Sequence, residues 1–218
     1  MRAAFAIAAA AALVATVGDL LMLWVANALR PGFAIASPPP GALRLGAALG
    51  VVAIPLYALG WAAAAARAAP ALGGVTPWVM VAGIAGATLG SYIHAATAWL
   101  IEGQMRSAAT TPVEAPLATV MSAGPSLTVP WAIATLLVVF TSGALVFAAR
   151  RGTVPRSWIA ANPAVVTVVL ALVGAPSELG RAFLVPAAPN LAHVVLFATA
   201  LASSHVCANW LSRDSGSV

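Results

Sequence analysis

The stretch GSYIHAATAWLIEG, from Gly90 to Gly103, decides how the chain folds. It belongs to an apolar window between Val75 and Ile101, and a helix needs only ~20 apolar residues to cross the hydrocarbon core of a bilayer. His94 lies in the body of the stretch and Glu102 at its end, although titratable groups inside a membrane are rare and costly. The stretch therefore predicts a membrane helix with one polar face.

The composition extends this prediction to the whole chain. Of its 218 residues, 62% are hydrophobic and 7% are charged, and the mean hydropathy is +0.99, whereas a soluble domain is about 25% charged. We therefore predict an all-α fold with a single domain over residues 1–218, a six-transmembrane-helix bundle with both termini on the same side. The six apolar windows are Ala3–Leu29, Leu45–Ala66, Val75–Ile101, Leu127–Ala149, Trp158–Ala175 and Leu191–Leu211.

The charged residues and the single cysteine limit the possible functions. All ten basic residues are arginines, and in a membrane protein such an excess sets topology and contacts headgroups, so no nucleic-acid partner is predicted. The absence of lysine excludes a Schiff base, and a lone Cys207 excludes an intrachain disulfide and a cysteine metal cluster. No nucleotide-binding or nucleophile motif occurs. We predict no cofactor and no metal.

The arginines also favour one orientation in the membrane. With six crossing helices, six arginines lie on the side of the termini and four on the other side. The densest cluster is Arg150, Arg151 and Arg156 in a short loop on the side of the termini, and arginine in short loops stays in the cytoplasm. We therefore predict a multi-pass protein of the cell inner membrane whose N- and C-termini are cytoplasmic.

His94 and Glu102 share a helical stripe with small residues. Small residues let a second helix approach closely, so we predict that His94 and Glu102 face other helices and not lipid. A structural role is open for both residues: His94 as a hydrogen-bonding partner of a neighbouring carbonyl group, and Glu102 as a residue of the membrane interface. The stripe consists of Gly83, Ala87, Gly90, His94, Ala98 and Glu102.

Asp19 is an acid deep inside the first window. It lies ten residues before Leu29, roughly 15 Å below the outer end of the window at the rise of an α-helix. A carboxylate at that depth costs about 2.5 to 3.5 kcal/mol and is normally paired, protonated or hydrated. Its predicted partner is His94, or an arginine that reaches in from Arg44 or Arg181.

Further polar residues occur where the fifth window ends and the sixth begins. Glu178 and Arg181 follow Pro176, and they form either part of a polar vestibule or a local ion pair. Asn190 and His193 begin the sixth window. On the predicted topology these groups share the outer half of the bundle with Asp19 and with the end of the third window.

Together these residues predict one polar pocket in the outer half of the bundle. Its apolar side comes from two aromatic residues that share a face of the second window after Pro55. The predicted catalytic residues are Asp19, His94, Glu102, Glu178 and His193. The predicted substrate-binding residues are Tyr57, Trp61, Arg181 and Asn190.

Four segments carry a resemblance to known proteins. They are GDLL in the first window, IPLYALGW in the second, PRSWIAANP at the start of the fifth and PNLAHVVLF at the start of the sixth. Together they resemble a family of small bacterial multi-span integral membrane proteins of unknown function. The resemblance covers most of the chain and implies no activity. It implies that the polar ends of the windows form a shared site.

Three functions are compatible with such a pocket. The first is a membrane-embedded enzyme that acts on a lipophilic substrate by carboxyl and histidine acid–base chemistry, of the isomerase, cyclase or hydratase type. The second is a small proton-coupled transporter, in which the same groups relay a proton. The third is a non-catalytic protein that binds a lipid, or a haem between His94 and His193. Membrane lipids and a lipophilic small molecule are the expected partners, and the sequence is compatible with an oligomer.

Overall fold

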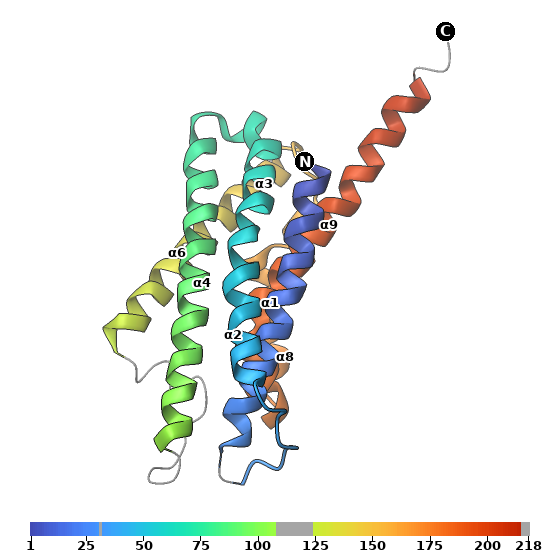
Figure 1. Cartoon of the computed structure of the whole chain (residues 1–218). Helices are drawn as coiled ribbons and strands as arrows, with labels where there is room; N and C mark the ends of the chain where they lie inside the picture. The colour runs from blue at the N-terminus through green and yellow to red at the C-terminus, as the bar shows by residue number, and fades with distance from the viewer. Residues whose placement is uncertain (31, 108–123, 215–218) are drawn as a thin grey trace.

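Long runs rich in Ala and Leu, which are strong helix formers, favour helix over most of the chain. The computed structural model describes residues 1–30, 32–107 and 124–214, with side chains up to Ser204 except that of Ser107. Successive segments run in opposite directions and form a bundle (Figure 1), and no strand occurs in these ranges. The helices are α1 (Arg2–Ala28), α2 (Ala42–Ala53), α3 (Tyr57–Leu72), α4 (Thr76–Ser107), α6 (Pro125–Arg150), α7 (Ser157–Ala160), α8 (Pro163–Gly174) and α9 (Val185–Asp214).

One helical stretch continues from α2 through α3 to α4, with two short 3-10 turns inside it. The turn Ile54–Leu56 contains Pro55, which has no N–H and so interrupts the α-helical hydrogen bonds between α2 and α3. The turn Gly73–Val75 joins α3 to α4, and Gly73 has a φ of +53°, a conformation that favours glycine. The chain therefore reverses, and α4 runs antiparallel to α3 (Figure 1).

The predicted count of six membrane-crossing helices is not confirmed. The second and third apolar windows share one continuous stretch, and the fifth is divided into the short helices α7 and α8. The all-helical class is confirmed, whereas the count of six is not. Within the described residues, four stretches are long and apolar enough to cross: Arg2–Ala28, Ala42–Arg106, Pro125–Arg150 and Gly180–Ser204.

Asn162 divides the fifth window. Its side-chain oxygen accepts a hydrogen bond from the backbone N–H of Ala164 at 3.1 Å, and Pro163 follows as the first residue of α8. Its amide nitrogen donates to the carbonyl oxygen of Ser142 in α6 at 3.0 Å. An N-cap followed by proline begins a new helix, so α8 has only 12 residues.

Replacing this buried cap is expected to destabilise the bundle. Asn162→Ala removes the cap and the bond to Ser142, and it should lower the free energy of unfolding by about 1–3 kcal/mol. Thermal unfolding of the detergent-purified protein measures the change. Asn162→Ser is the matched control, because serine keeps a cap acceptor and loses only the longer reach to Ser142. Equal losses of unfolding free energy in Asn162→Ala and Asn162→Ser would show that the cap contributes nothing to stability.

The core combines aromatic rings with alanine. Phe5 lies edge-on to Trp158 with ring centroids 5.9 Å apart, and the rings of Trp61 and Phe197 are also buried. Alanines cover the inner face of α1, including Ala12, which is fully buried. Because alanine is short, the neighbouring helices approach α1 closely, and the large rings fill the wider gaps.

The outer surface of the bundle is apolar as well. Leu136 of α6, Leu172 of α8 and Trp99 of α4 are about two-thirds exposed or more, and many further leucine and valine side chains are exposed. Water-soluble monomers rarely expose apolar surface this extensive. The long apolar helices and the apolar exterior are compatible with a membrane protein.

The backbones of α1 and α2 touch at Gly18 and Gly46. A Cβ atom at Gly18 would lie 2.7 Å from the carbonyl oxygen of Gly46, and a Cβ atom at Gly46 would lie 2.7 Å from the carbonyl oxygen of Gly18. Only glycine fits such an approach without a shift of one helix. The contact brings Asp19, the residue after Gly18, beside the backbone of α2.

Candidate functional site

Asp19 and His94 are in direct contact. The Oδ1 atom of Asp19 in α1 lies 3.1 Å from Nδ1 of His94 in α4. The Asp19 side chain is 15% exposed and that of His94 is 3% exposed, so the pair is largely removed from solvent. The predicted contact between these two residues is therefore confirmed. Neither Arg44 nor Arg181 is the partner of this carboxyl group.

The second nitrogen of His94 determines how many protons the pair holds. Nε2 lies 3.0 Å from the carbonyl oxygen of Gly46 in α2. A carbonyl oxygen only accepts hydrogen bonds, so Nε2 carries a hydrogen. The contact between Nδ1 and Asp19 then requires another proton, bound either to the imidazole or to the carboxyl group. In both forms the pair has no net charge and shares one movable proton.

Asn190 and Tyr57 extend this contact into a chain of hydrogen bonds. The Asn190 amide nitrogen donates to Oδ2 of Asp19 at 2.6 Å, and the Tyr57 hydroxyl donates to the Asn190 side-chain oxygen at 2.8 Å. These bonds fix which end of the Asn190 amide faces the acid. The chain joins side chains of α3, α9, α1 and α4 and ends on the backbone of α2.

His193 lies beside the chain, among aromatic rings. Its imidazole stacks on Tyr57 with ring centroids 4.9 Å apart, and the Trp61 ring lies edge-on at 5.8 Å. Its Nδ1 lies 2.7 Å from the carbonyl oxygen of Pro189, one turn earlier in α9. Nδ1 is therefore the protonated nitrogen of the neutral ring.

A cavity of about 370 Å³ borders all of these side chains. Helices α1, α3, α4, α6, α8 and α9 contribute to its wall, which is apolar apart from this group and a few threonines. Small-molecule sites are typically apolar cavities of 300–1,000 Å³ with a few convergent polar groups. Its polar residues are Asp19, Tyr57, His94 and Asn190 of the hydrogen-bonded chain and the neighbouring His193, and Trp61 is part of the apolar wall.

Glycines make room for the rings, and this was not predicted. A Cβ atom at Gly50 of α2 would overlap the His94 imidazole, and one at Gly83 of α4 would lie 2.7 Å from Cγ of Trp61. Gly50 also lies four residues after Gly46, whose carbonyl holds His94. This glycine spacing in the second window is the signal that would have indicated the helix contact. Gly90 of the predicted stripe lies near Ile54 of the turn between α2 and α3.

Three of the predicted site residues do not line the cavity. Glu102 is 40% exposed and pairs with Arg106 one turn later, at 2.9 Å. The predicted orientation of Glu102 toward the bundle is therefore wrong. Because α4 continues to Ser107, Glu102 lies in its final turns, beyond the level at which neighbouring helices enclose His94.

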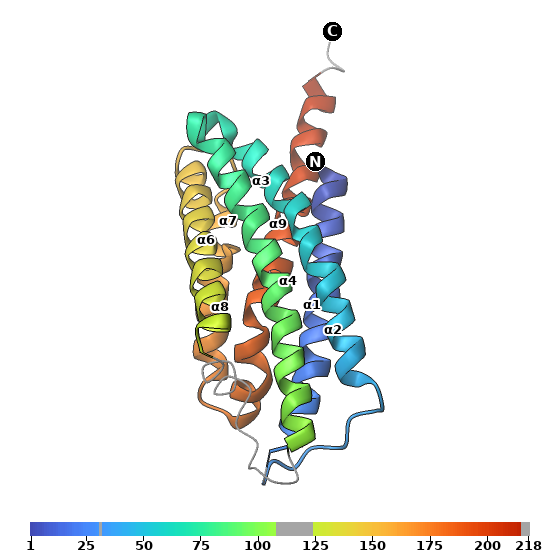
Figure 2. The same cartoon turned by 60° about the vertical axis from the view of Figure 1, so that its left-hand side comes forward.

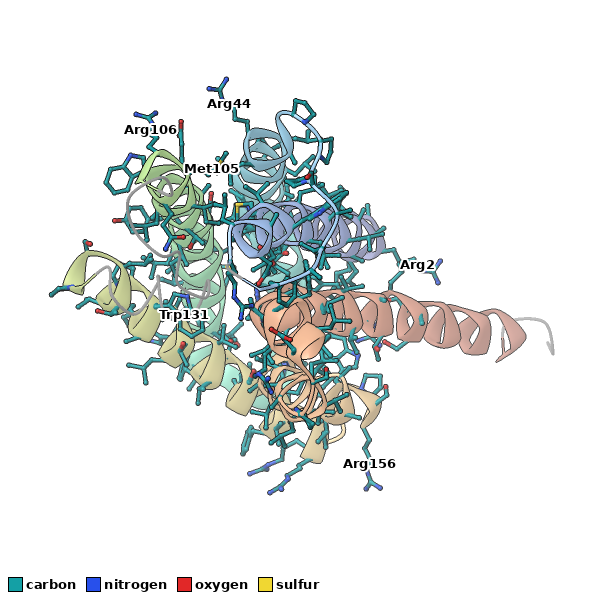
Figure 3. All side chains as sticks on the ribbon, turned by 90° about the horizontal axis from the view of Figure 1, so that it is seen from below. Arg2, Arg44, Met105, Arg106, Trp131 and Arg156 are labelled. Atoms are coloured by element: carbon teal, nitrogen blue, oxygen red, sulfur yellow. The ribbon has the colours of Figure 1, made fainter. Side chains whose placement is uncertain are left out.

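Glu178 and Arg181 also lie outside the cavity, and they do not form the predicted ion pair. Glu178 is 62% exposed, 3.7 Å from Arg30, while Arg181 donates to the Ala175 carbonyl oxygen at 2.7 Å. A π-helical segment, Gly180–Leu184, begins between the two residues, so they do not lie on a regular α-helix. Other arginines, such as Arg2, Arg44, Arg106 and Arg156, extend outward from the bundle (Figure 3), and no arginine of the described chain lines the cavity.

The geometry gives little support to a haem between the two histidines. Both nitrogens of His94 already have partners, Asp19 and the Gly46 carbonyl group. His193 retains only Nε2. Among the described residues, no group of three or more His, Cys, Asp and Glu side chains is arranged to hold a metal ion.

The fold and the site define the chain as an all-helical protein, compatible with a membrane, that has a buried carboxyl–imidazole pair beside an apolar cavity. The chain belongs to the family of unknown function DUF6796, which it matches over residues 1–205. The predicted resemblance to a family of unknown function is confirmed to this extent. No curated protein and no solved structure matches the chain.

Proposed function

We propose that this protein crosses the inner membrane six times, with both termini in the cytoplasm. Support comes from the six alternating segments, which are α1, α2 with α3, α4, α6, α7 with α8, and α9 (Figures 1 and 2). The fifth segment, divided at Asn162 into α7 and the 12-residue α8, is the shortest of the six. The arginine bias supports the cytoplasmic placement of the termini.

Within this membrane protein, we propose an enzyme that transfers a proton to and from a lipophilic substrate. The single observation that supports this most is the shared proton between Asp19 and His94 at the wall of an apolar cavity. A general acid must lie within hydrogen-bond reach of its substrate, and a substrate in the cavity meets that condition. The carboxyl group also has lone pairs beyond those that His94 and Asn190 use.

An isomerisation illustrates how this pair would work. The pair gives its proton to one carbon of a double bond, so a C–H bond forms and the neighbouring carbon becomes a cation. The pair, now negative, then takes a proton from the next carbon as that C–H bond breaks. One proton enters the substrate and one leaves, and neither oxidant nor reductant is needed. Attack of water or of a second double bond on the same cation would give hydration or cyclisation.

The distribution of polar groups favours an enzyme over a transporter. A translocation path needs polar or hydrated surface toward both sides of the membrane. In the described chain, the ionisable and amide groups of the cavity gather at the level of Asp19, and the remaining wall is mainly apolar. A binding pocket for a lipophilic molecule agrees better with this wall.

Solvent deuterium tests the proposal without knowledge of the substrate. Wild-type protein in vesicles made from a total bacterial lipid extract is incubated in D₂O, and the lipids are analysed by mass spectrometry. Isomerisation, proton-initiated cyclisation and hydration all place deuterium on carbon, so at least one lipid species should gain mass. Vesicles without the protein are the control. If no lipid gains carbon-bound deuterium above that control, the enzyme proposal is wrong.

A further inference from the structure

His193 offers a hydrogen-bond acceptor at the cavity. Its Nδ1 donates to the Pro189 carbonyl oxygen of its own helix, which leaves a lone pair on Nε2, the ring atom distal from that contact. Tyr57, Trp61 and Phe197 surround the ring, and His193 has no ion pair within the described part of the chain. Because a charged imidazole is costly in such surroundings, the ring is neutral. The group that complements Nε2 is an O–H or N–H donor.

The cavity offers no compensation for a charged ligand. No arginine and no glutamate of the described chain lines it. The Asp19–His94 pair has no net charge, and its carboxyl group is already held by His94 and Asn190. A phosphate or carboxylate headgroup would therefore lack a cation, and an ammonium group would compete with His94 for the carboxyl group of Asp19. This excludes the headgroups of ordinary phospholipids.

The cavity wall reaches the outer, apolar surface of the bundle. Trp131 and Val139 of α6 and Val168 of α8 line the cavity, and all three are more than 40% exposed. Helices α6 and α8 lie side by side on this face (Figure 2). Surface of this kind lies against lipid chains in the proposed membrane orientation. A lipid can therefore reach the cavity sideways without passing through water.

From these features we propose that the cavity binds an uncharged lipid with a hydroxyl group, which reaches it from the bilayer between α6 and α8. The hydroxyl group donates its hydrogen to Nε2 of His193, and the hydrocarbon part lies against Trp61 and the small residues of α4. This inference rests on the proposed function, because it names the class of lipid that the acid–base pair acts on. Hydroxyl binding by His193 holds that lipid beside Asp19.

Competitive lipid binding tests the proposal. Detergent-purified full-length protein is mixed with equal amounts of 1-hexadecanol, its methyl ether, hexadecanoate and hexadecyl phosphate, and bound lipids are counted by native mass spectrometry. The alcohol should exceed the ether by about 3- to 10-fold, the effect of one hydrogen bond, and should exceed both anions. Equal binding of alcohol and ether, or preference for an anion, overturns the proposal. These comparisons need only the wild-type protein.

Two variants assign the binding to His193 and to the α6–α8 face. His193→Phe keeps an aromatic ring beside Tyr57 and should lower the alcohol-to-ether ratio to about 1; an unchanged ratio contradicts the role of His193. Val168→Trp should slow association of the alcohol; an unchanged rate contradicts access between α6 and α8. Alcohol selectivity without deuterium incorporation would refute the enzyme and retain the hydroxyl-binding site. Deuterium incorporation without alcohol selectivity would refute only the hydroxyl-binding site.

Discussion

Asp19→Asn is expected to fold like the wild-type protein and to lose proton transfer to lipid by at least ~100-fold. Asparagine has the same shape, and its side-chain oxygen accepts the hydrogen bond from Asn190 as the carboxyl group does. Its amide nitrogen donates to Nδ1 of His94, which then holds its lone pair there and keeps its hydrogen on Nε2 for Gly46. All the hydrogen bonds survive, while the movable proton is gone.

The comparison with Asp19→Ala separates chemistry from folding. Alanine leaves Asn190 and Nδ1 of His94 without their partner, and loss of one member of a buried pair costs about 3–5 kcal/mol. Thermal unfolding should therefore be near wild-type for Asp19→Asn and clearly lower for Asp19→Ala. Deuterium incorporation into lipid should be absent in both variants. Wild-type incorporation by Asp19→Asn would show that the shared proton has no catalytic role.

Gly50→Ala is expected to displace the imidazole of His94. A Cβ atom at this position overlaps the ring. Gly50 lies in α2 and His94 in α4, so neither backbone moves easily. The ring must move away from Asp19 and from the Gly46 carbonyl oxygen, or the helices must separate. Overpacking of this kind costs about 1–3 kcal/mol, and proton transfer should fall as far as in Asp19→Asn. Thermal unfolding and deuterium incorporation measure the two effects.

Two further variants establish the cause. Gly143→Ala, in α6, adds the same atom where nothing beyond the adjacent backbone of its own helix lies within 4 Å, so its stability should equal or exceed that of the wild-type protein. Gly50→Ala combined with His94→Ala removes the ring that the new Cβ meets. The double variant should therefore lose less free energy of unfolding than the two single variants lose together. Strict additivity would mean that Gly50 and His94 do not interfere.

Residues expected to face the interior of the bundle at the level of Asp19 were predicted well. Asp19, His94, Asn190, His193, Tyr57 and Trp61 lie around one cavity, because helical periodicity and the cost of burying polar groups both direct such side chains into a bundle. Their roles in binding and catalysis stay predictions. Polar residues near helix ends were predicted poorly, since nearby solvent gives their side chains several satisfactory directions.

Helix interruptions account for the other differences. Asn162 with Pro163, and the π-helical segment Gly180–Leu184, divide or bend apolar runs whose composition alone looks continuous. Hydropathy averages over such runs and does not register a single cap or an extra residue in a turn. The predicted ion pair between Glu178 and Arg181 assumed a regular helix and so placed both side chains wrongly.

The sequence by itself determined the helical class, the apolar exterior and the presence of an acid and an imidazole deep inside apolar windows. These features depend only on composition and on the local order of residues. Only the tertiary structure decided which groups meet. The contact of Gly18 with Gly46, the space at Gly50 and the orientation of Asn190 each depend on two or more helices brought together from distant parts of the chain. The shared proton of Asp19 and His94 is a property of that assembly, since it requires the carbonyl group of a third helix.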